Sequence, residues 1–145
     1  MHRRQILLEI IVSLYVLLFL YASLSKFLDF RTFVKEMDNQ PLPNSWTPFL
    51  VWFIPCSEIA LSLALIFERT RLTGLYGSLV LMGLFSSYTL IVLLHGFSYI
   101  PCSCGGIIKR LTWRQHLVLN LLFVGLAIAG IVFQRRKAKH PLITK

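Results

Sequence analysis

The chain has 145 residues, of which 56% are hydrophobic and only 14% charged, and its mean hydropathy is +0.69. This balance excludes an ordinary soluble domain. The formal net charge of +9 does not indicate nucleic-acid binding, because the basic residues lie at the ends of apolar segments and no polar domain presents them to a phosphate backbone.

Four apolar runs approach the ~20 residues that a helix needs to cross a bilayer. They cover residues 6–24, 49–67, 72–94 and 117–133. The first ends at "YASLSK" without an A-x-A cleavage site, so we expect it to be a spanning helix and no signal peptide. The sequence predicts an all-α integral membrane bundle of four transmembrane helices, as a single domain over residues 1–145 with a basic tail at 135–145.

The positions of Lys and Arg predict the orientation of the bundle, because positively charged loops stay on the cytoplasmic side. With both termini inside, nine of these residues fall on the cytoplasmic side and six on the outer side. We therefore expect cytoplasmic termini, and we expect the loop between the third and fourth runs outside the cytoplasm.

A short amphipathic helix is expected directly after the first run. In "RTFVKEMDNQPLPNSW", Phe33 and Met37 have helical spacing before Pro41 and Pro43 end the pattern. Such a helix would lie on the outer membrane interface. Lys26, at the end of the first run, is expected to extend toward the headgroups.

The loops and small residues predict how the helices pack. Only "ERTR" joins the second and third runs, so these two helices should be antiparallel neighbours. Glycines and serines are spread through the third run, and Gly125 and Ala129 are four residues apart in the fourth. Small residues allow close helix contact in lipid.

The second run contains "IPCSEIA", which places a carboxyl group near the middle of the membrane. Pro55 removes a helical hydrogen bond beside Cys56 and Glu58. A carboxylate in hydrocarbon is costly, so Glu58 should either handle protons or be a protonated acid bonded to a neighbouring helix, for example to Tyr88. Cys56 alone is more typical of a small core residue than of a reactive thiol.

The stretch "YIPCSCGGII" places Cys102 and Cys104 two positions apart on a turn. A disulfide in such a small ring would be strained and easily reduced, and Lys109 and Arg110 nearby would stabilise a thiolate. The pair is therefore a candidate redox centre. Two alternatives stay open. The cysteines could be structural, either as ordinary loop cysteines or with one of them bridged permanently to Cys56, or they could form a soft-metal site for an ion such as Cu(I) that uses Cys102, Cys104 and Cys56.

The fourth run opens with "TWRQHLVLN", which places Trp113, His116 and Asn120 on one helical stripe. Trp113 is typical of an interfacial anchor. His116 either accepts a proton from a Cys102 or Cys104 thiol or is a polar residue at headgroup level. Asn120, one turn deeper, is expected to form an interhelical hydrogen bond.

Three of these stretches resemble the methylamine-utilisation MauE family, within the broader DoxX-like group of redox-associated membrane proteins. They are "YASLSKFLDFRTF", "LPNSWTPFLVWFIPCSEIALSLALI" and "PCSCGGIIKRLTWRQHLVLN", and the resemblance covers about residues 5–134. The family's usual loop is closer to C-x-C-F-G, whereas this chain has Gly105 directly after the second cysteine.

The resemblance implies a protein of the bacterial inner membrane that supports thiol–disulfide chemistry outside the cytoplasm. In the namesake case this is maturation of the disulfide-rich small subunit of methylamine dehydrogenase. The implied partner is an extracytoplasmic thiol or disulfide protein, either thioredoxin-like or a maturation client. On this hypothesis the catalytic residues are Cys102, Cys104, His116 and Glu58, and a membrane quinone is the candidate electron acceptor.

Overall fold

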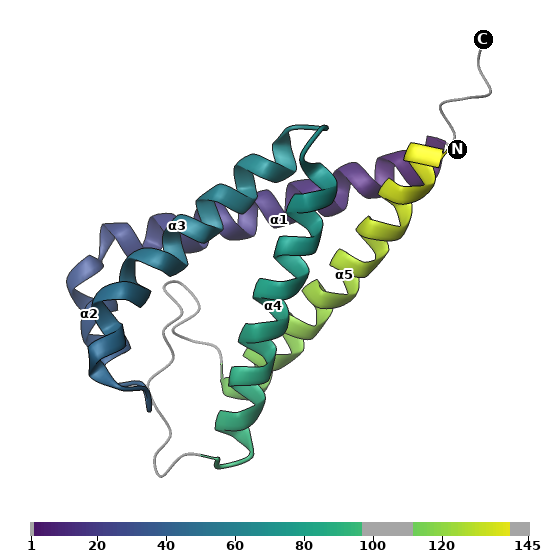
Figure 1. The fold of residues 1–145 in the computed structure, drawn as a ribbon. Coiled ribbons are helices and arrows are strands. Elements are labelled where there is room, and N and C mark those ends of the chain that lie inside the picture. Colours follow the sequence, from purple (N-terminus) through teal and green to yellow (C-terminus); the bar gives the residue numbers. More distant parts are fainter. Residues whose placement is uncertain (1, 97–111, 140–145) are drawn as a thin grey trace.

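A computed structural model of the chain describes residues 2–96 and 112–139, and every regular element within these ranges is a helix (Figure 1). The elements are α1 (His2–Leu28), α2 (Phe30–Asp38), the 3-10 helix η1 (Asn44–Trp46), α3 (Thr47–Ile66), α4 (Arg71–Leu93) and α5 (Trp113–Lys139). Within the described ranges, α1, α3, α4 and α5 are long and apolar enough to cross a membrane. The predicted bundle of four spanning helices, with a short helix after the first, is confirmed.

The spanning helices at the two ends of the chain extend beyond their apolar runs. α1 begins at His2 and α5 continues to Lys139, so the first residues of the predicted basic tail are helical. Arg, Lys and Gln have good helix propensities, and the long side chains of Lys and Arg reach polar surroundings from a helix end. The apolar run therefore marks the part of the helix that suits lipid, and the helix itself is longer.

The four long helices form two antiparallel pairs, α1 with α3 and α4 with α5. The turn after α3 is short and makes α4 its antiparallel neighbour, as predicted. The pairs lie together at the end of the bundle that carries this turn, which we call the turn end. They diverge toward the other end, which carries α2 and which we call the α2 end (Figure 1).

Aromatic and aliphatic side chains fill the centre of the bundle. Tyr15 of α1 has no exposed surface, its hydroxyl donates a hydrogen bond to the Phe123 carbonyl of α5, and its ring meets that of Phe123 edge to face. Leu65 and Leu75 are also fully buried in this cluster. These contacts join the two helix pairs.

The turn end is held by a buried guanidinium. Arg71 has a 6% exposed side chain, donates from Nε to the Leu65 carbonyl at 3.2 Å and pairs through one terminal nitrogen with Glu9 at 2.8 Å. Glu68, in the turn, accepts a hydrogen bond from Lys137, whose ammonium holds the pKa of this exposed carboxyl below its ordinary value. The turn is thus bonded to both α1 and α5.

The glycines differ in the room around them. A Cβ on Gly74 would lie 3.1 Å from the Ala64 backbone, and one on Gly130 would lie 3.0 Å from Leu75. A Cβ on Gly83 or Gly125 would meet no atom of the described residues within 4 Å. The prediction of close helix contact therefore holds for Gly74 but is wrong for Gly83 and Gly125. The close contact at Gly130 was not predicted.

The short helix α2 folds back against α3. Phe33 and Met37, which the sequence placed on one face, are buried against Val51. Gln40, just after α2, is 4% exposed and donates from Nε2 to the Glu36 carbonyl at 3.0 Å. This packing holds α2 beside the space that opens between the helix pairs.

Candidate functional site

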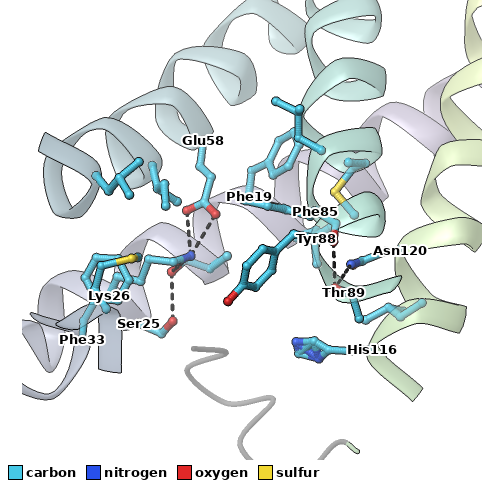
Figure 2. Close-up of a pocket in the computed structure, with 18 of the residues that line it drawn as sticks. Phe19, Ser25, Lys26, Phe33, Glu58, Phe85, Tyr88, Thr89, His116 and Asn120 are labelled. Atoms are coloured by element: carbon cyan, nitrogen blue, oxygen red, sulfur yellow. Dashed lines mark hydrogen bonds and ion pairs between the residues drawn. The ribbon is translucent and has the colours of Figure 1, made fainter. Parts of the chain in front are cut away.

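A cavity of about 410 Å³ lies at the α2 end, where the helix pairs diverge (Figures 1 and 2). Residues from all five α-helices line it. Most of its walls are apolar or aromatic and include Phe19, Phe33, Leu50, Ile54, Met82, Phe85 and Leu119. A few polar side chains project between these apolar residues. An apolar cavity with a small number of polar groups is typical of a ligand-binding site, so this cavity is the candidate site.

The strongest polar interaction of the cavity joins Lys26 of α1 to Glu58 of α3. Lys26 Nζ lies 2.8 Å from Glu58 Oε1 and 3.1 Å from Oε2, and donates a third bond to the Ala22 carbonyl at 3.2 Å. The Glu58 side chain is 2% exposed and that of Lys26 12%. Figure 2 shows the pair at one wall of the cavity.

This pair corrects two expectations. The partner of Glu58 is Lys26 and not Tyr88, and Lys26 turns inward to the acid instead of extending toward headgroups. Both follow from charge, because an ammonium and a carboxylate at this distance compensate much of each other's cost of burial. Both residues can be read from the sequence, but the sequence does not reveal that α1 lies against α3.

Tyr88 joins α4 to the segment after α2. Its ring projects from α4 into the cavity (Figure 2), and its hydroxyl donates to Oε1 of the buried Gln40. Sequence reasoning missed Gln40. Its only signal is a polar residue beside Pro41 at the end of a short amphipathic helix, which is typical of any exposed loop.

The start of α5 supplies the opposite wall. Thr112 and Gln115 form a capping box: the Thr112 N–H donates to Gln115 Oε1 at 2.9 Å, and the Gln115 N–H donates to Thr112 Oγ1 at 3.4 Å. This cap begins the helix at Trp113, which lines the cavity together with His116. The predicted stripe of Trp113, His116 and Asn120 therefore faces the cavity.

His116 and Asn120 differ in their bonding. His116 Nδ1 is buried and has no hydrogen-bond partner among the residues that the structure describes. Asn120 Nδ2 donates to Thr89 Oγ1 of α4 at 3.5 Å, and Thr89 in turn donates to the Phe85 carbonyl. The interhelical bond predicted for Asn120 is present, at the long end of hydrogen-bond distances.

The cysteines are not part of the described cavity. Cys56 is exposed on α3, although a lone cysteine of this kind was expected in the core. Cys102 and Cys104 lie outside the described residues. Within residues 2–96 and 112–139, no group of three or more His, Cys, Asp or Glu side chains is placed to hold a metal ion.

The comparison with protein families gives one match. The family model described as "Methylamine utilisation protein MauE" matches residues 4–133. This range extends from the first turn of α1 into the last third of α5 and includes every residue named above as a wall of the cavity. Searches of curated proteins and of solved structures gave no match.

Proposed function

The chain belongs to the MauE family, and from this membership we propose that it is a multi-pass accessory protein of the bacterial inner membrane that serves methylamine utilisation. The four apolar helices support the membrane assignment. The excess of Lys and Arg predicted for the cytoplasmic side supports cytoplasmic termini, with the α2 end facing outward.

The role we propose is thiol–disulfide exchange with an extracytoplasmic protein, carried out by Cys102 and Cys104. The observation that carries it is the place of the C-x-C pair in the chain: it lies between α4 and α5, whose nearest described ends are both at the α2 end. On the predicted topology this is the side where disulfides persist.

The exchange balances without a further reactant. A thiolate of the partner attacks one sulfur of the Cys102–Cys104 disulfide, forms a mixed disulfide and releases the other sulfur as a thiolate. The second partner thiol then displaces the first cysteine, which leaves an oxidised partner and a reduced pair. Reoxidation of the pair passes two electrons and two protons to an acceptor, for which a membrane quinone, becoming a quinol, is the proposed class.

Two cavity residues have proposed roles in this cycle. His116 is the proton acceptor that we assign, since its buried Nδ1 makes no hydrogen bond within residues 2–96 and 112–139. Glu58 was a second candidate for proton transfer, but its ion pair with Lys26 favours a positioning role that holds α1 against α3.

The test is a set of cysteine variants in the native host. Cys102→Ser, Cys104→Ser and the double variant should lose function equally, because a dithiol cycle needs both sulfurs. One single variant should accumulate a reductant-sensitive adduct with its partner, since the mixed disulfide is not resolved. Cys56→Ser is the matched control and should retain function.

Two results would count against the proposal. Full function of the double variant would remove the cysteines from the mechanism. Partial function of each single variant, with bound soft metal and no covalent adduct, would favour the alternative of a soft-metal-binding or transport protein.

A further inference from the structure

We infer that the cavity at the α2 end binds the head group of a membrane quinone. The inference deepens the proposed function, which needs an acceptor of two electrons and two protons. The binding itself rests on the cavity alone, because every residue used below belongs to the described helices.

The charge of the walls selects a neutral ligand. Among the described residues that line the cavity, Glu58 is the carboxylate and Lys26 the ammonium, and they are paired with each other at 2.8 Å; the imidazole of His116 is the other titratable base. An organic cation would find no unpaired carboxylate, and an anion would have to compete with Glu58 for the ammonium. A neutral molecule enters without breaking this ion pair.

The hydrogen-bonding groups select a ligand with a polar atom at the edge that faces α5. The three donors of Lys26 are already used by Glu58 and the Ala22 carbonyl. The groups that can bond to a ligand are therefore His116 and Asn120 on the facing wall, across the Tyr88 ring (Figure 2). The buried Nδ1 of His116 has no hydrogen-bond partner in the described helices. A buried polar atom without a partner is unfavourable, and a ligand that supplies one removes this cost. An acyl chain does not meet this requirement, whereas a quinone carbonyl oxygen accepts a hydrogen bond from Nδ1 when the imidazole carries its proton there.

The remaining walls suit a flat ring that arrives from lipid. Phe33, Phe85, Tyr88 and Trp113 line the cavity, and aromatic rings stack favourably on a planar head group. The volume of about 410 Å³ lies toward the small end of ligand sites and admits a substituted ring with the start of its tail. The site lies between helices that span the membrane, which is the phase in which quinones dissolve.

The binding test uses Trp113 as a reporter. The chain has three tryptophans, and Trp46 and Trp52 are both exposed and do not line the cavity. The full chain with Trp46→Phe and Trp52→Phe is placed in lipid nanodiscs and titrated with decylubiquinone. We expect saturable quenching of Trp113 fluorescence, while the variant that retains only Trp52 shows a linear, collisional decrease.

Variants of the α5 wall then locate the ligand. On the Trp113-only background, His116→Phe should weaken binding by about tenfold, because one buried hydrogen bond of roughly 1.4 kcal/mol is lost. Asn120→Leu should weaken it by a similar factor. Ser87→Ala is the matched control on α4: Ser87 is exposed, bonds to the Gly83 carbonyl and does not line the cavity, so its affinity should be unchanged.

Three outcomes would overturn the inference. These are quenching of Trp113 that does not saturate, equal affinity in the His116→Phe and parent proteins, and displacement of decylubiquinone by decanol, which has the chain without the ring. The same titration on the Cys102→Ser/Cys104→Ser background separates the two proposals. Saturable binding on this background, together with full function of the same variant in the native host, refutes the proposed function alone. The absence of saturable binding, together with loss of function of that variant, refutes the quinone site alone.

Discussion

The ammonium of Lys26 and the carboxylate of Glu58 join α1 to α3 across 32 positions of sequence, with Nζ 2.8 Å from Oε1. Both groups belong to helices that span the membrane, and the acid is almost completely buried. A buried pair of this kind stabilises little compared with two well-packed apolar residues, but the loss of one partner leaves an uncompensated charge. Its main effect is to fix which helix faces meet at the α2 end.

Single substitutions of this pair should therefore be more harmful than a double one. We expect Glu58→Leu or Lys26→Met alone to lower the free energy of unfolding by about 3–5 kcal/mol, and the double variant to recover most of this loss. Unfolding in mixed micelles with increasing SDS measures the effect. Lys35→Met is the control on exposed α2 surface, and additive losses in the double variant would show that the two residues do not act as a pair.

The turn end should require the guanidinium group of Arg71, which a lysine does not replace. Arg71→Lys keeps the charge but cannot donate from Nε to the Leu65 carbonyl while also reaching Glu9, so we expect a loss of roughly 1–3 kcal/mol. The thermal midpoint in detergent reports the change. Arg69→Lys, at an exposed position in the same turn, should leave that midpoint unaltered. Equal midpoints for the two variants would contradict a structural role of the Arg71 contacts.

Added volume should be tolerated at one glycine of α4 and not at another. Gly74→Leu places a side chain against the Ala64 backbone and Leu65, and overpacking of this kind costs roughly 1–3 kcal/mol. Gly83→Leu meets open space, so it should retain parental stability and gain helix propensity. The SDS midpoints of the two variants decide this. A loss at Gly83 as large as that at Gly74 would indicate that another molecule covers that face of α4.

The orientation of the bundle can be tested with single cysteines on a background without Cys56, Cys102 and Cys104. Ser45→Cys in η1 is at the α2 end, and Arg69→Cys is in the turn at the opposite end; both positions are exposed. With the termini inside, a membrane-impermeant maleimide should label Ser45→Cys in intact cells and Arg69→Cys only after permeabilisation. The reverse pattern would place the α2 end in the cytoplasm.

The composition and the four apolar runs were enough to predict the number and order of the spanning helices. A segment without water must satisfy its backbone internally, so a run of about 20 apolar residues has few alternatives to a helix. Phe33 and Met37 likewise predicted the buried face of α2 from their spacing alone. The stripe of Trp113, His116 and Asn120 was correct for the same reason, since residues at i, i+3 and i+7 share a face of any helix.

The tertiary structure decided which residues meet. In lipid, neighbouring helices gain no general hydrophobic energy from contact, so their rotation depends on particular packing and polar pairs that periodicity does not encode. Only the structure shows that Lys26 pairs with Glu58 and that Tyr88 donates a hydrogen bond to Gln40. It also shows that Gly74 contacts α3, whereas Gly83 contacts none of the described residues. The sequence by itself determined that four helices cross the membrane and that α2 follows the first. The two helix pairs diverge where the close contacts between them end, and this point depends on the packing of the whole bundle and not on any one segment. The cavity that brings together Lys26, Glu58, Tyr88 and His116 therefore exists only in the packed bundle.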